Sequence, residues 1–201
     1  MDIGVFLDVD KTLTSRTIQE VFAERLHCSD VYRFIERDFQ LGTASAEDFG
    51  GRLVELFAER GLTLELASEF FAVVERRAGA DEVLALPVTK YLVSTGPDYY
   101  VNRLAANSGI PLDNVICSTY HFEAPGGAIS SCEAVSDEER AEFVRRRVAL
   151  HDLTIGVGDS PTRDTEFIDA CTLSLLTVPS PGHLFVPDLR VLRDLVVRLA
   201  G

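Results

Sequence analysis

Short apolar runs alternate with helical periodicity along most of this 201-residue chain. The first run, residues 3–7, has the length of a buried strand. In residues 18–80 apolar positions recur at helical spacing, and no convincing strand interrupts them. From Tyr91 onward strand-length runs alternate with helices, which is typical of a parallel sheet built from βαβ units. The pattern predicts an α/β protein with a Rossmann-like parallel sheet and a small inserted helical bundle.

Capping residues, turn residues and apolar runs predict where the individual helices and strands lie. In the helical block, Ser45 is expected to cap a helix that ends at Gly61, and Thr63 to cap the next, with apolar positions through Val74. A hairpin is predicted around the turn at residues 124–127. Further strands are expected at 91–93, 115–117, 154–157 and 173–178, and further helices at 98–107, 137–150, 165–170 and 189–199.

The helical block interrupts the sheet immediately after its first strand. We therefore expect a core domain of residues 1–14 and 81–201 and a helical cap domain of residues 15–80. Because the block follows the strand that ends in Asp8 and Asp10, the cap is expected to lie over those side chains as a lid.

Charge and composition narrow the possible partners. The formal charge of −13, with no basic stripe, would repel a polyanion, so nucleic acid is not expected. No membrane partner is expected either, because no run reaches the roughly 18 apolar residues of a membrane span. Met1 and Asp2 lead directly into a strand without a signal-peptide pattern, which favours a cytoplasmic location. The sequence carries no signal for oligomeric state. Free thiols are expected at all four cysteines, which lack metal-ligand spacing: Cys28, Cys117, Cys132 and Cys171.

Polar residues follow several of the predicted strands. Since the carboxyl ends of parallel strands lie at one edge of a sheet, these residues should converge there. Asp8, Asp159 and the carbonyl oxygen of Asp10 are hard oxygen donors, a set that favours Mg²⁺. A phosphate ester would need such a cation, backbone N–H groups and one or two basic side chains to approach these acids. The convergent groups are Asp8, Asp10, residues 94–96, residues 158–164 and the start of the helix near Arg140.

The order of these motifs resembles the haloacid dehalogenase superfamily of aspartate-nucleophile phosphatases, and within it the phosphoserine phosphatase-like branch. Residues 15–80 stand where that branch has a helical cap, and residues 119–132 where it has a small hairpin. The stretches similar to the family's first, second and fourth motifs are residues 8–14, residues 93–96, and residues 158–160 with Asp164.

The resemblance implies Mg²⁺-dependent hydrolysis of a small phosphorylated metabolite. Asp8 would become an aspartyl phosphate, and Asp10 would protonate the leaving oxygen and then activate water. The cation would be bound by Asp8, the Asp10 carbonyl and Asp159, with Asp164 acting directly or through water. Phosphate oxygens would be held by Ser94, by the N–H groups of Thr95 and Gly96, and by Arg140.

Two positions depart from the family pattern. The third motif is usually a lysine, whereas Arg140, 19 residues before Asp159, is the cation found here. Arginine binds phosphate as a planar fork and can replace the lysine charge with different geometry. Phosphoserine phosphatases bind the amino group and the carboxyl group of their substrate with two cap residues. In this sequence the nearest matches are Arg16 or Thr17 at the first of these positions and Arg52 at the second. No carboxylate stands at the first of those positions.

Several alternatives to the main hypothesis remain at this point. Phosphoserine phosphatase itself is one, and a phosphotransferase that passes the phosphoryl group to an alcohol is another. A dehalogenase is disfavoured because Asp159 and Asp164 would then have no purpose. The non-enzymatic alternative is a phosphometabolite-binding protein that has lost turnover. Arg140 keeps that alternative open, while the Asp8 and Asp10 pair argues against it.

Overall fold

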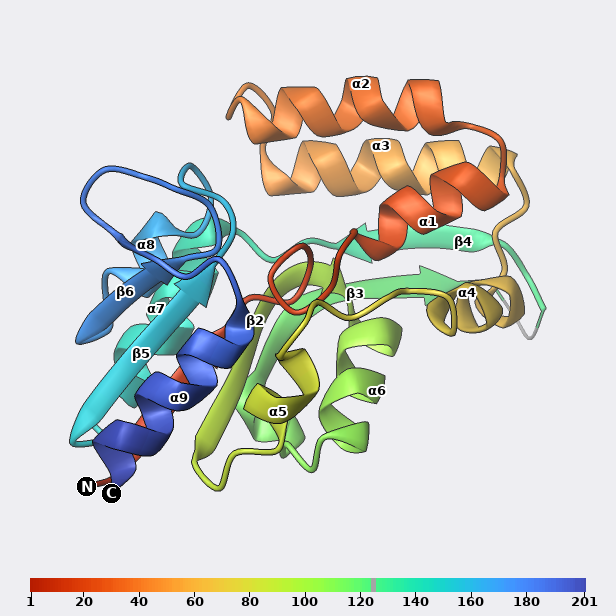
Figure 1. The fold of residues 1–201 in the computed structure, drawn as a ribbon. Coiled ribbons are helices and arrows are strands. Elements are labelled where there is room, and N and C mark those ends of the chain that lie inside the picture. Colours follow the sequence, from red (N-terminus) through yellow and green to blue (C-terminus); the bar gives the residue numbers. More distant parts are fainter. Residues whose placement is uncertain (124–125) are drawn as a thin grey trace.

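One mainly parallel sheet organises the molecule (Figure 1). The structure is a computed structural model that describes residues 1–123 and 126–201. The described strands follow the order β4-β3-β2-β1-β5-β6-β7, with β4 antiparallel to β3 and every other neighbouring pair parallel. This topology confirms the predicted α/β class. The strands are β1 (Ile3–Leu7), β2 (Thr89–Pro97), β3 (Val115–Phe122), β4 (Ile129–Glu133), β5 (Leu153–Gly158), β6 (Leu173–Leu176) and β7 (Leu184–Phe185).

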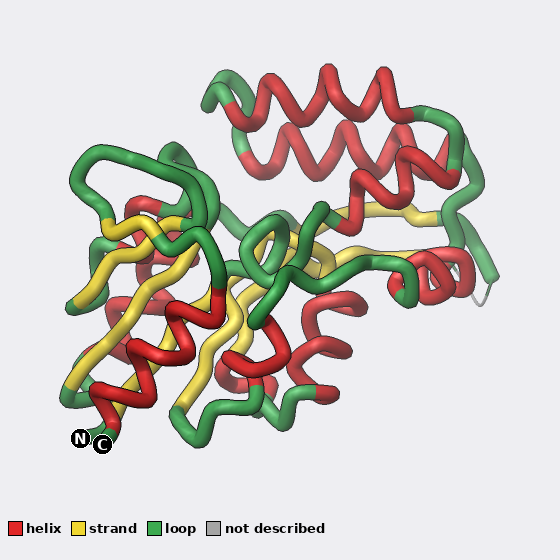
Figure 2. The backbone as a smooth tube through the Cα atoms, in the orientation of Figure 1, coloured by secondary structure: helices red, strands yellow, loops and turns green. Residues whose placement is uncertain are grey.

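Helices cover both faces of the sheet and its carboxyl edge. Figures 1 and 2 show α5, α6 and α9 on the near face, α7 and α8 on the far face, and α1 to α3 beyond the carboxyl ends of the central strands. The helices are α1 (Ile18–Arg25), α2 (Ser29–Gln40), α3 (Ala46–Glu59), α4 (Leu64–Phe71), α5 (Ala80–Leu84), α6 (Asp98–Asn107), α7 (Asp137–Val148), α8 (Thr165–Ile168) and α9 (Leu189–Ala200), with a 3₁₀ turn η1 (Leu112–Asn114).

Strand β1 lies at the centre of the core, and all five of its residues are buried. Side chains alternate between the two faces of a strand, so Val5 and Leu7 belong to the larger apolar cluster and Phe6 to the smaller one on the α7 and α8 face. Phe6 stacks on Tyr91 of β2 with ring centroids 4.4 Å apart. This packing fixes the end of β1, where the catalytic candidates begin.

Side-chain caps fix where three helices begin. Reciprocal capping boxes join Thr17 to Glu20 at α1, Ser45 to Asp48 at α3 and Ser136 to Glu139 at α7. The predictions of a helix after Ser45, of a helix after Thr63 and of a helix at residues 98–107 are confirmed.

The chain enters and leaves the helical block through two neighbouring segments. Ser15 N–H donates to the carbonyl of Glu75 at 2.9 Å, and Arg77 N–H donates to that of Leu13 at the same distance. The domain boundaries at residues 15 and 80 stay a prediction, and these two crossing segments lie close to them.

Some elements differ from the sequence prediction. β3 is one continuous strand that serves both the parallel sheet and the hairpin with β4, whereas two separate runs were expected. α4 ends at Phe71, so Val74 lies outside it. The short elements α5 and β7 were missed because neither is long enough to show a period. Residues 124–125 of the expected hairpin turn lie outside the described residues.

Two expectations about the chain as a whole can be compared with the structure. Within the described residues, no helix combines the length and apolarity needed to cross a bilayer. The four cysteines are free thiols, as expected.

Candidate active site

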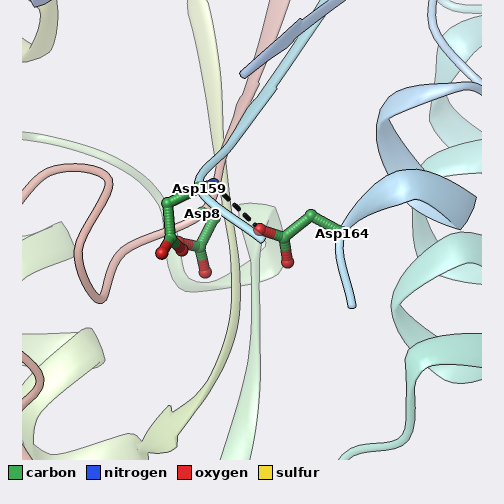
Figure 3. A group of neighbouring side chains, drawn as sticks. All are labelled: Asp8, Asp159 and Asp164. Atoms are coloured by element: carbon green, nitrogen blue, oxygen red, sulfur yellow. Dashed lines mark hydrogen bonds between the residues drawn. The ribbon is translucent and has the colours of Figure 1, made fainter. Parts of the chain in front are cut away.

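Three carboxylates from two strand ends meet at the carboxyl edge of the sheet. Asp8 follows β1, and its N–H donates to the carbonyl of Val157 on β5 at 2.9 Å. Asp159 and Asp164 follow β5, and one oxygen from each of the three side chains lies within 4.8 Å of the others (Figure 3). Among the described residues, none gives Asp8 Oδ2 a hydrogen bond, although that atom is buried. A buried, unpartnered oxygen in a cluster of carboxylates fits a hard divalent cation.

Asp164 is held rigidly by the backbone of its own loop. Its Oδ2 accepts hydrogen bonds from the N–H groups of Asp159 at 3.0 Å and Ser160 at 2.9 Å. A Cβ atom on Gly158 would lie only 2.5 Å from the same oxygen, so glycine is required at the end of β5. The Asp164 carboxylate therefore fixes the backbone that carries the Asp159 side chain.

Burial and electrostatic repulsion raise the pKa values of Asp8 and Asp159. Burial, followed by the charges of Asp164 and Asp159, raises the pKa of Asp8 well above its usual range, and the Arg140 charge partly offsets this rise. Burial and the Asp164 charge raise the pKa of Asp159 to about 7. A divalent cation would relieve this repulsion, which is the electrostatic requirement of a metal site.

Asp10 joins the end of β1 to the cap. Its Oδ1 accepts a hydrogen bond from the N–H of Ile18, in the first turn of α1, at 3.2 Å. On its other side a Cβ atom on Gly96 would lie 2.7 Å from Asp10 Oδ2, so the carboxyl group packs directly on that glycine. Burial raises the pKa of Asp10 to about 7, although the Ile18 hydrogen bond lowers it. A carboxyl group with this pKa can give up or accept a proton near neutral pH.

Arg140 is buried, with only 2% of its surface exposed. Its guanidinium donates to Asp164 Oδ1 at 2.8 Å, to Asp137 Oδ1 at 2.6 Å and to the Arg163 carbonyl at 2.7 Å. Burial opposes the charged guanidinium, but the Asp164 and Asp137 carboxylates raise its pKa above the usual value. The side chain lines a cavity formed by residues of the sheet edge and of the helical block, and its charge lowers the pKa of Asp8.

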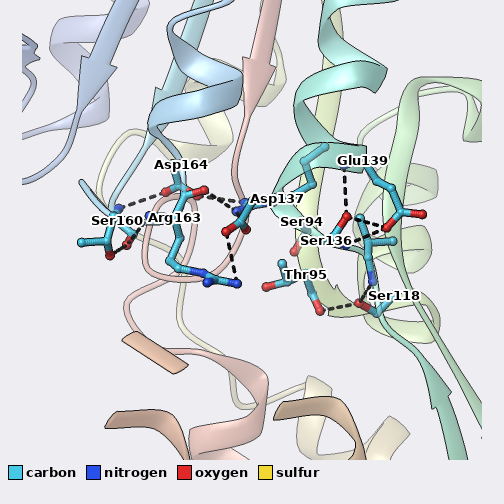
Figure 4. A network of polar contacts seen from close by, with 12 residues as sticks. Ser94, Thr95, Ser118, Ser136, Asp137, Glu139, Ser160, Arg163 and Asp164 are labelled. Atoms are coloured by element: carbon cyan, nitrogen blue, oxygen red, sulfur yellow. Dashed lines mark hydrogen bonds and ion pairs between the residues drawn. The ribbon is translucent and has the colours of Figure 1, made fainter. Parts of the chain in front are cut away.

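Besides Arg140, three residues at the end of β2 were expected to bind phosphate oxygens, and they take different positions. Ser94 is fully buried, and its Oγ accepts the N–H of Gly96 at 2.9 Å. Of the three, only Thr95 lines the cavity, and its carbonyl accepts a hydrogen bond from Ser118 at 2.9 Å (Figure 4). Phosphate binding by these residues stays a prediction.

The three expected specificity residues separate into two groups. Thr17 lines the cavity, where its hydroxyl lies 3.0 Å from that of Tyr32. Arg16 and Arg52 are not among the residues that line it. Arg16, which precedes α1, pairs with Glu24 at 2.7 Å, and the half-buried Arg52 on α3 pairs with Asp38 at 2.9 Å.

Several cavity residues were not identified from the sequence as site residues. Lys11 has a φ of 62° and turns its ammonium toward the cap, 2.6 Å from Glu36 and 3.4 Å from Glu20. Thr17 with Glu20 has the spacing of a capping box, a signal that could have placed the first turn of α1 over Asp10. These cavity residues are Lys11, Gln19, Tyr32, Glu36, Gln40 and Phe49, while Ser160 and Arg163 lie within residues 158–164, which were expected at this edge without individual roles.

Arg163 closes one side of the cavity. Its guanidinium pairs with Asp137 at 3.2 Å, as Figure 4 shows, and its central carbon lies 3.8 Å from the centroid of the Phe39 ring on α2. A core loop and a cap helix therefore meet at this side chain. No sequence motif distinguishes it from a surface arginine.

Known proteins share this fold at low sequence identity. A substrate-bound phosphoserine phosphatase complex superposes with a TM-score of 0.81 and 17% identity, over 96% of this chain and 97% of the other. A phospho-aspartyl intermediate analogue of phosphoserine phosphatase gives 0.80 and 18%, over 96% and 98%. A phosphoserine phosphohydrolase-like protein from Francisella tularensis gives 0.72 and 17%, over 98% and 100%.

The sequence itself matches at the level of the family. Comparison with curated proteins gives no match. Residues 5–167, which include β1, the helical block and the loop after β5, match the family described as haloacid dehalogenase-like hydrolase. The motif order and the carboxylate cluster agree with that match, and the chain belongs to the haloacid dehalogenase-like hydrolase family.

Proposed function

We propose that this protein is a Mg²⁺-dependent phosphatase that hydrolyses a small phosphate monoester through an aspartyl phosphate on Asp8. The observation that carries the proposal is the meeting of Asp8, Asp159 and Asp164 at one edge of the sheet, beside Asp10. The likeness to phosphoserine phosphatases supports it at the level of the fold. The cavity is small, about 60 Å³, and its lining includes all four of these aspartates.

In the first step Asp8 attacks phosphorus, so a bond from its carboxylate oxygen to phosphorus forms while the bond to the leaving oxygen breaks. Asp10 gives its proton to that leaving oxygen. In the second step Asp10 takes a proton from water, which attacks phosphorus and restores the free carboxylate of Asp8. The raised pKa of Asp10 supports this role, since the group must carry a proton when substrate binds.

A divalent cation would be held by Asp8, the Asp10 carbonyl, Asp159 and Asp164. When bound, it supplies positive charge that offsets repulsion between these carboxylates and the phosphate. Arg140 reinforces that charge from the far side of Asp164. Thr95, with Ser94 and Gly96 behind it, would position the phosphate oxygens.

Turnover of p-nitrophenyl phosphate tests the proposal. We expect hydrolysis that requires Mg²⁺, is abolished by chelation and returns when Mg²⁺ is restored. Asp8→Asn should lower kcat by about 10³-fold or more, because the amide is not a nucleophile. Asp113→Asn, the same change at an exposed position, should stay within about twofold. Hydrolysis that persists without a divalent cation or in Asp8→Asn would reject the mechanism.

A further inference from the structure

Gln19 is the least expected side chain in the cavity. It is the second residue of α1, only 4% exposed, and lines the cavity together with Asp10. Its Oε1 is buried, and within the described part of the chain no donor reaches it. Leaving a buried polar atom unsatisfied costs about 1–3 kcal/mol. A group that enters the cavity and donates a hydrogen bond would remove this cost.

The charged side chains above the carboxylates are already compensated within the protein. Lys11 is bonded to Glu36 at 2.6 Å and lies 3.4 Å from Glu20, and Arg163 pairs with Asp137 at 3.2 Å. The remaining polar groups that line this part of the cavity are the hydroxyls and amides of Thr17, Gln19, Tyr32 and Gln40. Neutral hydrogen-bonding groups therefore dominate the wall that the leaving group would meet.

We propose that the cavity selects the phosphate ester of a small neutral polyhydroxy alcohol, and that Gln19 determines this specificity by hydrogen bonding to a hydroxyl of the leaving group. The inference rests on the proposed function and adds the class of substrate. A hydroxyl can donate a hydrogen bond, so it can supply the partner that Gln19 Oε1 lacks. An apolar leaving group would leave Oε1 unsatisfied, and an ionised one would meet charges that are already paired.

A matched pair of substrates measures this preference in the unmodified protein. The two are 2,3-dihydroxypropyl phosphate and propyl phosphate, which differ only in two hydroxyl groups. We expect kcat/KM to be at least about tenfold higher for the dihydroxy ester, since a site built to bond a hydroxyl rejects the analogue that lacks it. Phosphoserine should also be a poorer substrate than the dihydroxy ester.

Variants of Gln19 assign the preference to one side chain. In Gln19→Leu the ratio of the two kcat/KM values should fall to within about threefold of unity. Asn107→Leu, the loss of an exposed amide at the end of α6 and outside the cavity, is the matched control and should change the ratio by less than about threefold. If Gln19→Leu does not fold, the substrate pair in the unmodified protein still decides the proposal.

The outcomes separate this inference from the proposed function. Failure to hydrolyse any phosphate ester would reject both. Mg²⁺-dependent hydrolysis of p-nitrophenyl phosphate with equal kcat/KM for the matched pair, or with a preference for phosphoserine, would reject the polyol preference alone. An unchanged ratio in Gln19→Leu would reject the role of Gln19.

Discussion

The two walls of the cavity, called here the floor and the roof, differ in how their charges are compensated. The floor, on the sheet edge, gathers carboxylates that repel one another and are partly balanced by a single buried arginine. The roof, on the cap and the loop below it, pairs each charge with an opposite one or uses neutral polar groups. The floor consists of Asp8, Asp10, Arg140, Asp159 and Asp164, and the roof of Lys11, Thr17, Gln19, Tyr32, Glu36 and Phe49.

This difference indicates how the two walls divide the work. An uncompensated cluster attracts a cation and gives carboxylates unusual pKa values, which serve chemistry. A wall whose charges are paired attracts neither cations nor anions strongly, so it can select substrates by hydrogen bonding and shape. The carboxylates of the floor repel one another strongly because they follow β1 and β5, two strands that are almost entirely buried.

Replacing Arg140, the positively charged residue of the floor, should have the largest effect on stability and activity. Arg140→Met would leave Asp164 and Asp137 without their shared partner, one of them almost fully buried. Breaking a buried ion pair from one side costs about 3–5 kcal/mol, so we expect that loss in the free energy of unfolding, measured with urea. In whatever fraction remains folded, kcat/KM should fall by about 100-fold or more.

Two variants make this result specific. Arg140→Lys keeps the charge but not the fork that reaches three acceptors, so intermediate losses are expected. Arg146→Met, on the exposed face of the same helix, should change the unfolding free energy by less than about 0.5 kcal/mol. An Arg140→Met protein as stable and active as the unmodified one would show that the floor does not depend on this charge.

Removing one of the floor's carboxylates should have the opposite effect on stability. Burial and repulsion raise the pKa of Asp8, so its ionised form is a cost to the metal-free protein. Asp8→Asn removes that charge and should raise the metal-free Tm by about 2–4 °C at about pH 8, or about 1 kcal/mol for a chain of this size. Asp113→Asn serves as the exposed control. If the metal-free Asp8→Asn protein had a lower Tm than the unmodified protein, the Asp8 charge would not be destabilising.

The floor could be predicted from the sequence far better than the roof. Asp8, Asp10 and Asp159 follow strands with clear apolar runs, and the parallel topology alone brings them to one edge. Gln19 could not be found in this way, because its position depends on how the cap helix α1 packs over the strand ends. Arg16 and Arg52, suggested by their positions in the family pattern, pair with Glu24 and Asp38 and are not among the residues that line the cavity, so their role in specificity stays a prediction.

The response to Mg²⁺ should depend on pH through the floor alone. The raised pKa values of Asp8 and Asp159 mean that the folded protein binds more protons than the unfolded chain, so metal-free stability falls as pH rises from about 4 to about 7. Mg²⁺ competes with those protons. The increase in Tm on adding Mg²⁺ should therefore be several degrees larger at about pH 8 than at about pH 5.5. An equal increase at both pH values would mean that the carboxylates are not the ligands.

The smallest expected effect concerns the ion pairs that join the loop after β1 to the cap helices. Burial alone would lower the pKa of Lys11, but Glu36 and Glu20 raise it, so the ammonium remains charged and joins the loop after β1 to α1 and α2. Lys11→Met breaks that link and should let the cap open more easily. We expect KM to rise about three- to tenfold with kcat within about threefold, because a loosened cap weakens substrate binding more than chemistry.

The other lysine supplies the control for this prediction. Lys90 bonds the carbonyls of Leu86 and Val88 near the start of β2, at the end of the strand away from the site. Lys90→Met should therefore leave KM within about twofold. If Lys11→Met lowered kcat as strongly as it raised KM, Lys11 would belong to the reacting floor, and the division between the two walls would have to be redrawn.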